Sequence, residues 1–251
     1  MSLYFCQYNI KSPVYLFMWE IFNMTKNYNT IIMRKLFLLI VSLLSLNSFS
    51  QNQPDPTKEL GVWYMYNGSH QISDKFGLKS MAHFRFFEVG DDMQQFIGRL
   101  GANYKFNKNI NATIGYAFLN TDETFNVNAG DFNEHRIYED LNVNHKIASL
   151  NLAHRFRGEQ RFFKSTTSNF FRYQLALGHP INEKWSTYLY NETFLDFEGE
   201  AYNQNWFGAG FKYKVSDVVK LQAGYQLIHV NEVGNFNRIQ LGVAISTDHR
   251  K

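Results

Sequence analysis

The chain has 251 residues, of which 45% are hydrophobic, 19% charged and 17% aromatic. A mean hydropathy of −0.35 excludes a helical membrane protein with several spans, because each span needs about 20 mainly apolar residues. The 24 Phe and 15 Tyr residues exclude a disordered chain, which lacks apolar surface to bury.

The formal net charge of +3 comes from the first part of the chain. Residues 1–50 hold four of the 25 basic residues and one of the 22 acidic residues, which leaves 21 of each in residues 51–251. A neutral body without a basic run has no electrostatic basis for binding nucleic acid. The single cysteine, Cys6, also lies in the first fifty residues, so no disulfide or thiolate metal site is expected after them.

Residues 33–50 have the pattern of a cleaved signal peptide. Arg34 and Lys35 form a positive start, and residues 36–46 form an apolar core of secretory length. Small residues then precede a predicted cleavage at Gln51. We therefore expect the chain to be secreted through the inner membrane.

Three further segments surround or follow this signal. Residues 1–32 have no secretory pattern, and we interpret them as an upstream extension, with synthesis beginning at Met33 or Met24. Residues 51–59 form a polar N-terminal segment with two prolines. The predicted folded domain covers residues 60–251.

From Leu60 onward, apolar and polar residues alternate in long runs. In residues 94–106, for example, Leu100 and Tyr104 share one face, whereas Arg99 falls on the other. Alternation with a period of two predicts β-strands. The predicted strands are 60–71, 78–89, 94–106, 110–120, 134–144, 148–162, 169–179, 185–196, 204–215, 218–230 and 236–247.

The length and spacing of these strands predict a membrane barrel. A tilted strand needs about 9–11 residues to cross a bilayer, whereas strands of globular proteins usually have about five or six. Aromatic residues near strand ends, such as Trp63 and Trp185, are typical of interfacial girdles. Short turns alternate with longer connections, of which residues 120–133 are the longest, as in outer-membrane barrels. The fold class is therefore all-β, an antiparallel transmembrane β-barrel closed as an up-and-down meander.

The strand number stays open at about 10–12. Eleven strands are identified, but a bacterial barrel with both termini on one side of the membrane needs an even number. Either a further strand lies within residues 51–60, or one of the eleven, such as 60–71, is false.

The polar faces of the strands carry many arginines. Buried charge destabilises a protein unless it is paired, and the planar guanidinium pairs well with carboxylates. One interpretation is a ladder of salt bridges that fills and rigidifies a narrow lumen, and the other is an arginine-lined path for small anionic solutes. The candidate lumen charge network comprises Arg85, Arg99, Arg136, Arg155, Arg157, Glu159, Arg161, Arg172, Glu192 and Arg238, with Glu134 and Asp140 as further counter-ions.

Three segments resemble one known family. The run RFRGEQRF in residues 155–162, FRYQL in 171–175 and YNETF in 190–194 resemble the domain-of-unknown-function 2490 family of predicted outer-membrane β-barrels from Gram-negative bacteria. The resemblance covers residues 60–247, with Trp206 as a departure where an arginine is common. It implies the fold and an outer-membrane location, and it implies no reaction. Further matching segments are residues 205–210 and 224–226.

The predicted function is that of a non-enzymatic outer-membrane barrel, either structural or a narrow passive pore for small solutes. The expected partners are outer-membrane lipids, the barrel-assembly machinery, periplasmic chaperones and small anionic solutes, and no nucleic acid. A secreted soluble barrel that binds an apolar ligand would need an apolar cavity, which the charged faces do not provide.

The alternative function is a lipid-acting hydrolase or acyltransferase with a site formed across strands. Barrel enzymes of this kind place a nucleophilic serine two residues after a histidine, so that the imidazole accepts the hydroxyl proton. No His-x-Ser sequence occurs, and no compact histidine spacing indicates a metal site. We therefore predict no catalytic, cofactor-binding or metal-binding residue and no cofactor. The eight histidines are His70, His83, His135, His145, His154, His179, His229 and His249.

Overall fold

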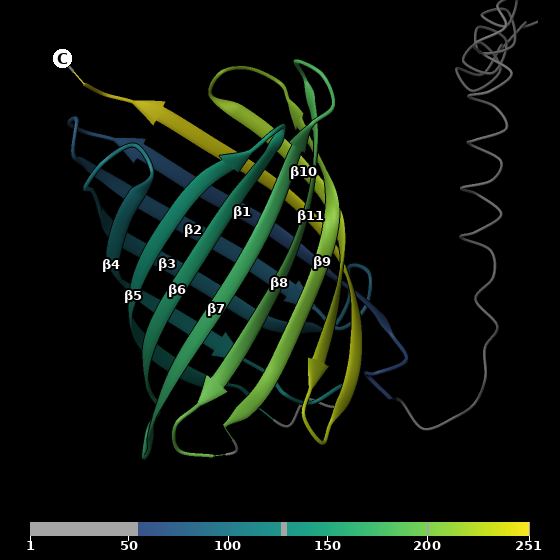
Figure 1. Cartoon of the computed structure of the whole chain (residues 1–251). Helices are drawn as coiled ribbons and strands as arrows, with labels where there is room; N and C mark the ends of the chain where they lie inside the picture. Colours follow the sequence, from purple (N-terminus) through teal and green to yellow (C-terminus); the bar gives the residue numbers. More distant parts are fainter. Residues whose placement is uncertain (1–54, 127–129, 200, 251) are drawn as a thin grey trace, which may run out of the picture. The chain divides into compact units, whose positions relative to one another are not determined.

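The computed structural model describes residues 55–126, 130–199 and 201–250, so the predicted signal peptide and upstream extension lie outside the described residues. Eleven strands form one closed barrel (Figure 1). No helix in the described ranges is long and apolar enough to cross a membrane. The strands are β1 (Leu60–Gln71), β2 (Phe76–Phe86), β3 (Met93–Lys105), β4 (Ile110–Thr121), β5 (Phe132–Ile147), β6 (Leu150–Phe162), β7 (Thr167–Pro180), β8 (Trp185–Asp196), β9 (Tyr202–Lys214), β10 (Val219–Val230) and β11 (Gly234–Asp248).

Each strand pairs in antiparallel fashion with its neighbour in the chain, and β1 and β11 close the barrel in parallel. This seam joins residues 60–71 to residues 237–248 without a break in register. The predicted barrel of 10–12 strands is confirmed, but the even number that we expected is wrong. Consecutive strands alternate in direction, so an eleventh strand can close the barrel only by running parallel to the first. The strand at 60–71 is real, and the described residues 55–59 form no further strand.

The two ends of the barrel differ in their connections. At the end that we call the short-turn end, the turns are 72–75, 106–109, 148–149, 181–184 and 215–218, and β11 ends beside them. At the opposite end, the loop end, β1 begins. The connections there are 87–92, 122–131, 163–166, 197–201 and 231–233.

The predicted strands 134–144 and 148–162 place the connection between them at the wrong residues. The ladder of β5 and β6 continues through these positions to the pair Ile147 and Leu150, and the chain reverses only at 148–149, where Ala148 has a φ of 53°. The polar residues Asn144 to Lys146 misled the sequence analysis, because side chains near a strand end reach water without leaving the ladder.

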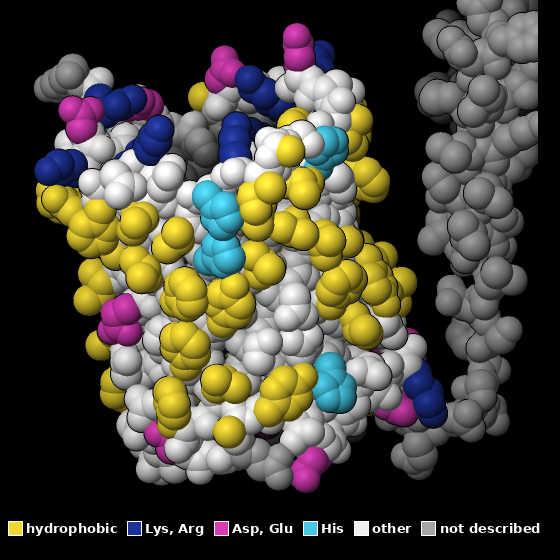
Figure 2. All heavy atoms as spheres, in the orientation of Figure 1, with side chains coloured by type: hydrophobic (Ala, Val, Ile, Leu, Met, Phe, Trp, Pro, Cys, Tyr) yellow, Lys and Arg dark blue, Asp and Glu magenta, His cyan; other side chains and the backbone are white. Residues whose placement is uncertain are grey.

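The wall of the barrel is apolar on its outer face and polar within. Leu100 and Ile114 are 67% and 60% exposed, whereas Arg238 and Glu159 are 1% and 0% exposed. Figure 2 shows apolar side chains over the wall and most of the charged side chains towards the ends, with one acidic side chain on the wall between them. Soluble proteins have the opposite distribution, since charged residues are almost never fully buried in them unless paired.

The parallel seam generates a prediction. In a background without Cys6, the variant Tyr64→Cys/Leu241→Cys should form a disulfide under mild oxidation, because these two residues are register partners on the outer face. Neighbouring strands lie about 4.8 Å apart, within the Cα separations that a disulfide spans. Gel mobility with and without reductant measures the bond. The matched control is Tyr64→Cys/Ile245→Cys, which should not form a disulfide. A disulfide in this control variant and none in Tyr64→Cys/Leu241→Cys would contradict this register.

Candidate functional site

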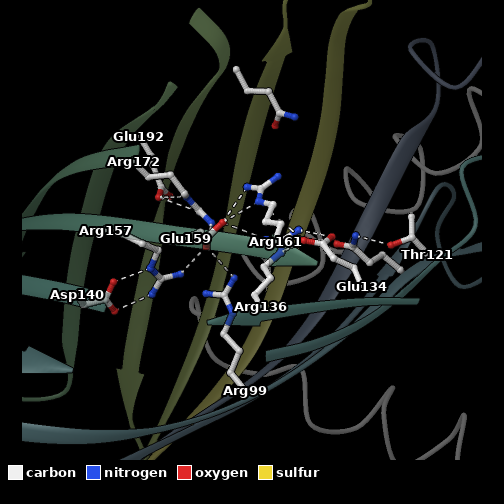
Figure 3. Close-up of polar contacts among 12 residues, drawn as sticks. Arg99, Thr121, Glu134, Arg136, Asp140, Arg157, Glu159, Arg161, Arg172 and Glu192 are labelled. Atoms are coloured by element: carbon white, nitrogen blue, oxygen red, sulfur yellow. Dashed lines mark hydrogen bonds and ion pairs between the residues drawn. The ribbon is translucent and has the colours of Figure 1, made fainter. Parts of the chain in front are cut away.

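Glu159 of β6 is the centre of the lumen charge (Figure 3). It is completely buried, and its carboxylate forms ion pairs of 2.8–3.5 Å with five guanidinium groups from β3, β5, β6 and β7. One negative charge cannot balance five positive ones, so the cluster depends on further carboxylates. The five arginines are Arg99, Arg136, Arg157, Arg161 and Arg172.

Four of these five arginines also pair with a second carboxylate, and two of them bind it through both of its oxygens. Arg157 donates from Nε and Nη2 to both oxygens of Asp140, at 2.6 and 2.7 Å. The two residues are register partners on β6 and β5, which explains the bidentate geometry. Arg136 likewise pairs with both oxygens of Glu134, two residues before it on the same face of β5.

Glu192 of β8 links the cluster to the next strands. Arg172 donates to its Oε1 from Nε at 2.9 Å, and Arg155 donates to the same oxygen from Nη2 at 2.7 Å. Gln174 donates to the other carboxylate oxygen at 3.0 Å. The network therefore extends around the inside of the barrel from β3 to β8.

Arg85 and Arg238 lie apart from this network. Arg85 stacks on the ring of Trp63 at 3.7 Å and donates to Gln95 at 2.9 Å. Arg238 donates to the backbone carbonyl of Asn237 at 2.9 Å. In the described part of the chain, neither has a carboxylate within ion-pair distance. The other six candidate arginines share four carboxylates, so the eight arginines give the lumen an excess of positive charge.

A second polar cluster lies on β8, β10 and β11. Tyr190 donates to Gln226 at 2.6 Å, and Gln240 donates to Tyr190 at 2.9 Å. Gly224 makes room for the neighbouring Tyr188, because a Cβ at that position would lie 2.2 Å from the Tyr188 hydroxyl. The sequence analysis missed these residues. Their signal was available in β10, where Gln222, Gly224 and Gln226 alternate with apolar residues.

Aromatic and aliphatic side chains fill the lumen towards the loop end. The rings of Trp63 and Trp206 meet edge to face at 5.3 Å, and Phe194 lies 4.6 Å from Trp206. Ile228 and Phe236 pack against the same cluster. Since Trp63 and Phe194 are each 3% exposed, this layer is packed inside the barrel.

The short-turn end contains a cavity of about 440 Å³, which we call the vestibule. Its lining includes Lys79, Arg99, Arg155 and Asn142. The Nε atoms of Arg99 and Arg155 are buried and have no hydrogen-bond partner among the described residues. Lys79 donates to the hydroxyl of Ser69 at 2.8 Å. Lys79, Arg99 and Arg155 therefore give the vestibule a cationic lining, beside the ion pair of Arg157 and Asp140.

No group of three or more His, Cys, Asp or Glu side chains that could hold a metal ion occurs within the described ranges. The geometry defines a class of protein: a closed β-barrel with a charged, filled lumen and an apolar outer wall.

Comparison with known proteins places the chain within a family. The model of the family "Protein of unknown function (DUF2490)" matches residues 60–240, so the chain belongs to the DUF2490 family, as the resemblance in the sequence predicted. No curated protein matches.

Two solved barrel structures are similar at low identity. The KdgM porin in complex with disordered oligogalacturonate is 15% identical, with a TM-score of 0.43, over 70% of this chain and 86% of that one. Outer-membrane expressed OmpT of Vibrio cholerae is 14% identical, with a TM-score of 0.38, over 62% of this chain and 51% of that one. At these scores the likeness does not extend to function.

The central position of Glu159 generates a prediction. The substitution Glu159→Gln should lower the free energy of unfolding by about 3–5 kcal/mol, because it leaves buried guanidinium groups without their shared counter-ion. Urea titration of the detergent-solubilised barrel, followed by heat-modifiable gel mobility, measures the loss. The matched control is Glu139→Gln, the same change at an exposed position on β5, which should not destabilise the barrel. Equal midpoints for the wild type and Glu159→Gln would contradict the assigned role.

Proposed function

We propose that the protein is an outer-membrane β-barrel, closed at the loop end, whose vestibule binds small anionic solutes at the short-turn end. The observation that carries the proposal is the inverted distribution of side chains, with apolar residues outside and a paired charge network inside. Two features add support: strands of 11 to 16 residues are long enough to cross a bilayer at a tilt, and a closed barrel leaves no unpaired strand edge in lipid.

The orientation follows from the connections. Outer-membrane barrels have short periplasmic turns and longer extracellular loops. On this basis the short-turn end and the vestibule face the periplasm, and the aromatic layer of Trp63 and Trp206 faces outward. Membrane lipids, the barrel-assembly machinery and periplasmic chaperones are then the partners of this protein.

The ligand class follows from the charge of the vestibule. Arg99, Arg155 and Lys79 line it, and guanidinium groups bind carboxylate and phosphate oxygens through paired donors. Small carboxylates or phosphates therefore fit this cavity better than cations or apolar solutes. A passive pore would require the charge network and the aromatic layer to move aside, so binding without passage is the function that the geometry supports best.

Electrical recording tests whether the lumen is closed. In planar bilayers, the purified full chain should give no conductance steps, because buried side chains block the lumen. An open porin inserted under the same conditions serves as the positive control. Stable steps of uniform size from the purified protein would contradict the closed lumen.

Anion binding to the vestibule is a separate prediction. Phosphate at ten times its dissociation constant should raise the free energy of unfolding by about 1.4 kcal/mol over chloride at equal ionic strength. The variant Arg155→Gln should lose this gain. The matched control Arg250→Gln, at the same end of the barrel but exposed, should keep it. Equal free energies of unfolding in phosphate and in chloride would contradict phosphate binding in the vestibule.

A further inference from the structure

Four polar side chains converge on the outer face of β1, β2 and β11. Nε2 of His70 lies 3.3 Å from Oγ of Ser80, and Nδ1 of His70 lies 2.8 Å from Oγ1 of Thr247. The hydroxyl of Tyr66 lies 3.0 Å from the same Ser80 Oγ. The His70 imidazole thus lies between the hydroxyl of Ser80 and the hydroxyl of Thr247, which orients the ring. This is the geometry of an activated serine nucleophile.

Gly68 makes this convergence possible. It is the register partner of Ser80 and lies between Tyr66 and His70 on the same face of β1. A Cβ at Gly68 would lie 2.0 Å from Ser80 Oγ and 2.7 Å from His70 Nε2. Any side chain there would displace both groups, so the glycine keeps open the space in which they meet.

The parallel seam supplies the third member of the cluster. Thr247 is the register partner of His70 across the seam, although the two residues are 177 positions apart in the chain. The serine comes from β2, on the other side of β1. The histidine, the serine and the threonine therefore come from three different strands, and no His-x-Ser sequence marks their meeting.

The position of the cluster points to a lipid as its substrate. Phe76, Tyr104 and Phe106 pack on one another near the short-turn end, with ring centroids 5.0 and 5.1 Å apart. Aromatic girdles mark the membrane interface, where the ester groups of membrane lipids lie. Ser80 is two outward-facing positions beyond Phe76 on β2, and the exposed Leu78 lies between them.

Other histidines on the outer wall lack a nucleophile. His135 bonds to the hydroxyl of Tyr116, and His154 bonds to the hydroxyl of Tyr173. Each of these hydrogen bonds satisfies two polar groups on the outer wall. Among the described residues, neither histidine is also hydrogen-bonded to a serine or threonine hydroxyl. Only His70 is hydrogen-bonded to a serine among the described histidines, and this difference separates its cluster from the two pairs.

We propose that Ser80, His70 and Thr247 form an acyl-ester hydrolase site for membrane lipids on the outer wall. Ser80 Oγ attacks the ester carbonyl carbon while its proton moves to His70 Nε2. The bond to the lipid alkoxide then breaks, and His70 returns the proton to that leaving group. Water, deprotonated in turn by His70, then attacks the acyl carbonyl carbon. The bond to Ser80 Oγ breaks, His70 returns the proton to Oγ, and the fatty acid is released. Tyr66 donates to the oxyanion of the tetrahedral intermediate.

This inference rests on the proposed outer-membrane location, and it does not involve the lumen. The sequence analysis predicted no catalytic residue, and the fold and the lumen network do not test that prediction. The proposed site departs from it. Thr247 touches no reacting atom and acts as a positioning residue. Its hydroxyl lies 2.8 Å from His70 Nδ1 and 2.7 Å from His249 Nε2. In the proposed site it accepts from Nδ1 and donates to His249, which leaves His70 Nε2 free to take the serine proton.

The first test uses the detergent-solubilised full chain and an alkyl fluorophosphonate, with mass spectrometry to locate the modified residue. We expect modification of Ser80 and release of labelled fatty acid from phosphatidylglycerol in mixed micelles. Ser80→Ala should abolish both, and His70→Asn should reduce both by about a hundredfold or more. The matched control Ser69→Ala, whose hydroxyl faces the lumen, should keep both.

The outcomes distinguish this proposal from the proposed location. A heat-modifiable barrel in which Ser80 is neither modified nor required for hydrolysis would overturn the hydrolase site and leave the membrane barrel intact. Loss of the protein from carbonate-washed membranes would overturn the location, whatever the labelling shows. Thr247→Val should lower hydrolysis and Thr247→Ser should restore it, and equal activity of these two variants would remove Thr247 as a positioning residue.

Discussion

The structure depends on the burial of positive charge inside a narrow barrel. A guanidinium group removed from water destabilises a protein unless a carboxylate and hydrogen bonds compensate it, and Glu159 is shared by five such groups. That sharing holds β3, β5, β6 and β7 at fixed relative heights, because a shift in register would separate charges from their partners. The same network separates the aromatic layer at the loop end from the vestibule at the short-turn end.

The sequence predicted the strands, and the residues that share a strand face, more fully than it predicted which charged side chains pair inside the barrel. Alternation placed Arg155, Arg157, Glu159 and Arg161 on one face of one strand, and the structure has them there. Alternation carries no information on which strands face each other across the lumen, so it could not separate Arg238 from the network. Which strands face each other depends on strand number, tilt and closure, which are properties of the whole barrel.

The same limit applied to the outer wall. A search along the chain finds sites whose members are close in sequence, whereas the neighbours of a residue in a sheet come from adjacent strands. His70 meets Ser80 through the β1–β2 hairpin and Thr247 through the seam. The first contact could be derived from the predicted hairpin and its register. The second required the parallel closure, which the expectation of an even strand number concealed.

The parallel seam also has a consequence for the order of assembly. Every other pair of neighbouring strands joins segments adjacent in the chain, so each hairpin can form locally, whereas β1 and β11 must wait until all the strands between them are in place. Contacts of such long sequence separation form late, because the entropy of loop closure opposes them. His70 and Thr247 therefore meet only in the completed barrel, and a chain that is still being inserted carries the serine and the histidine without the residue that orients them.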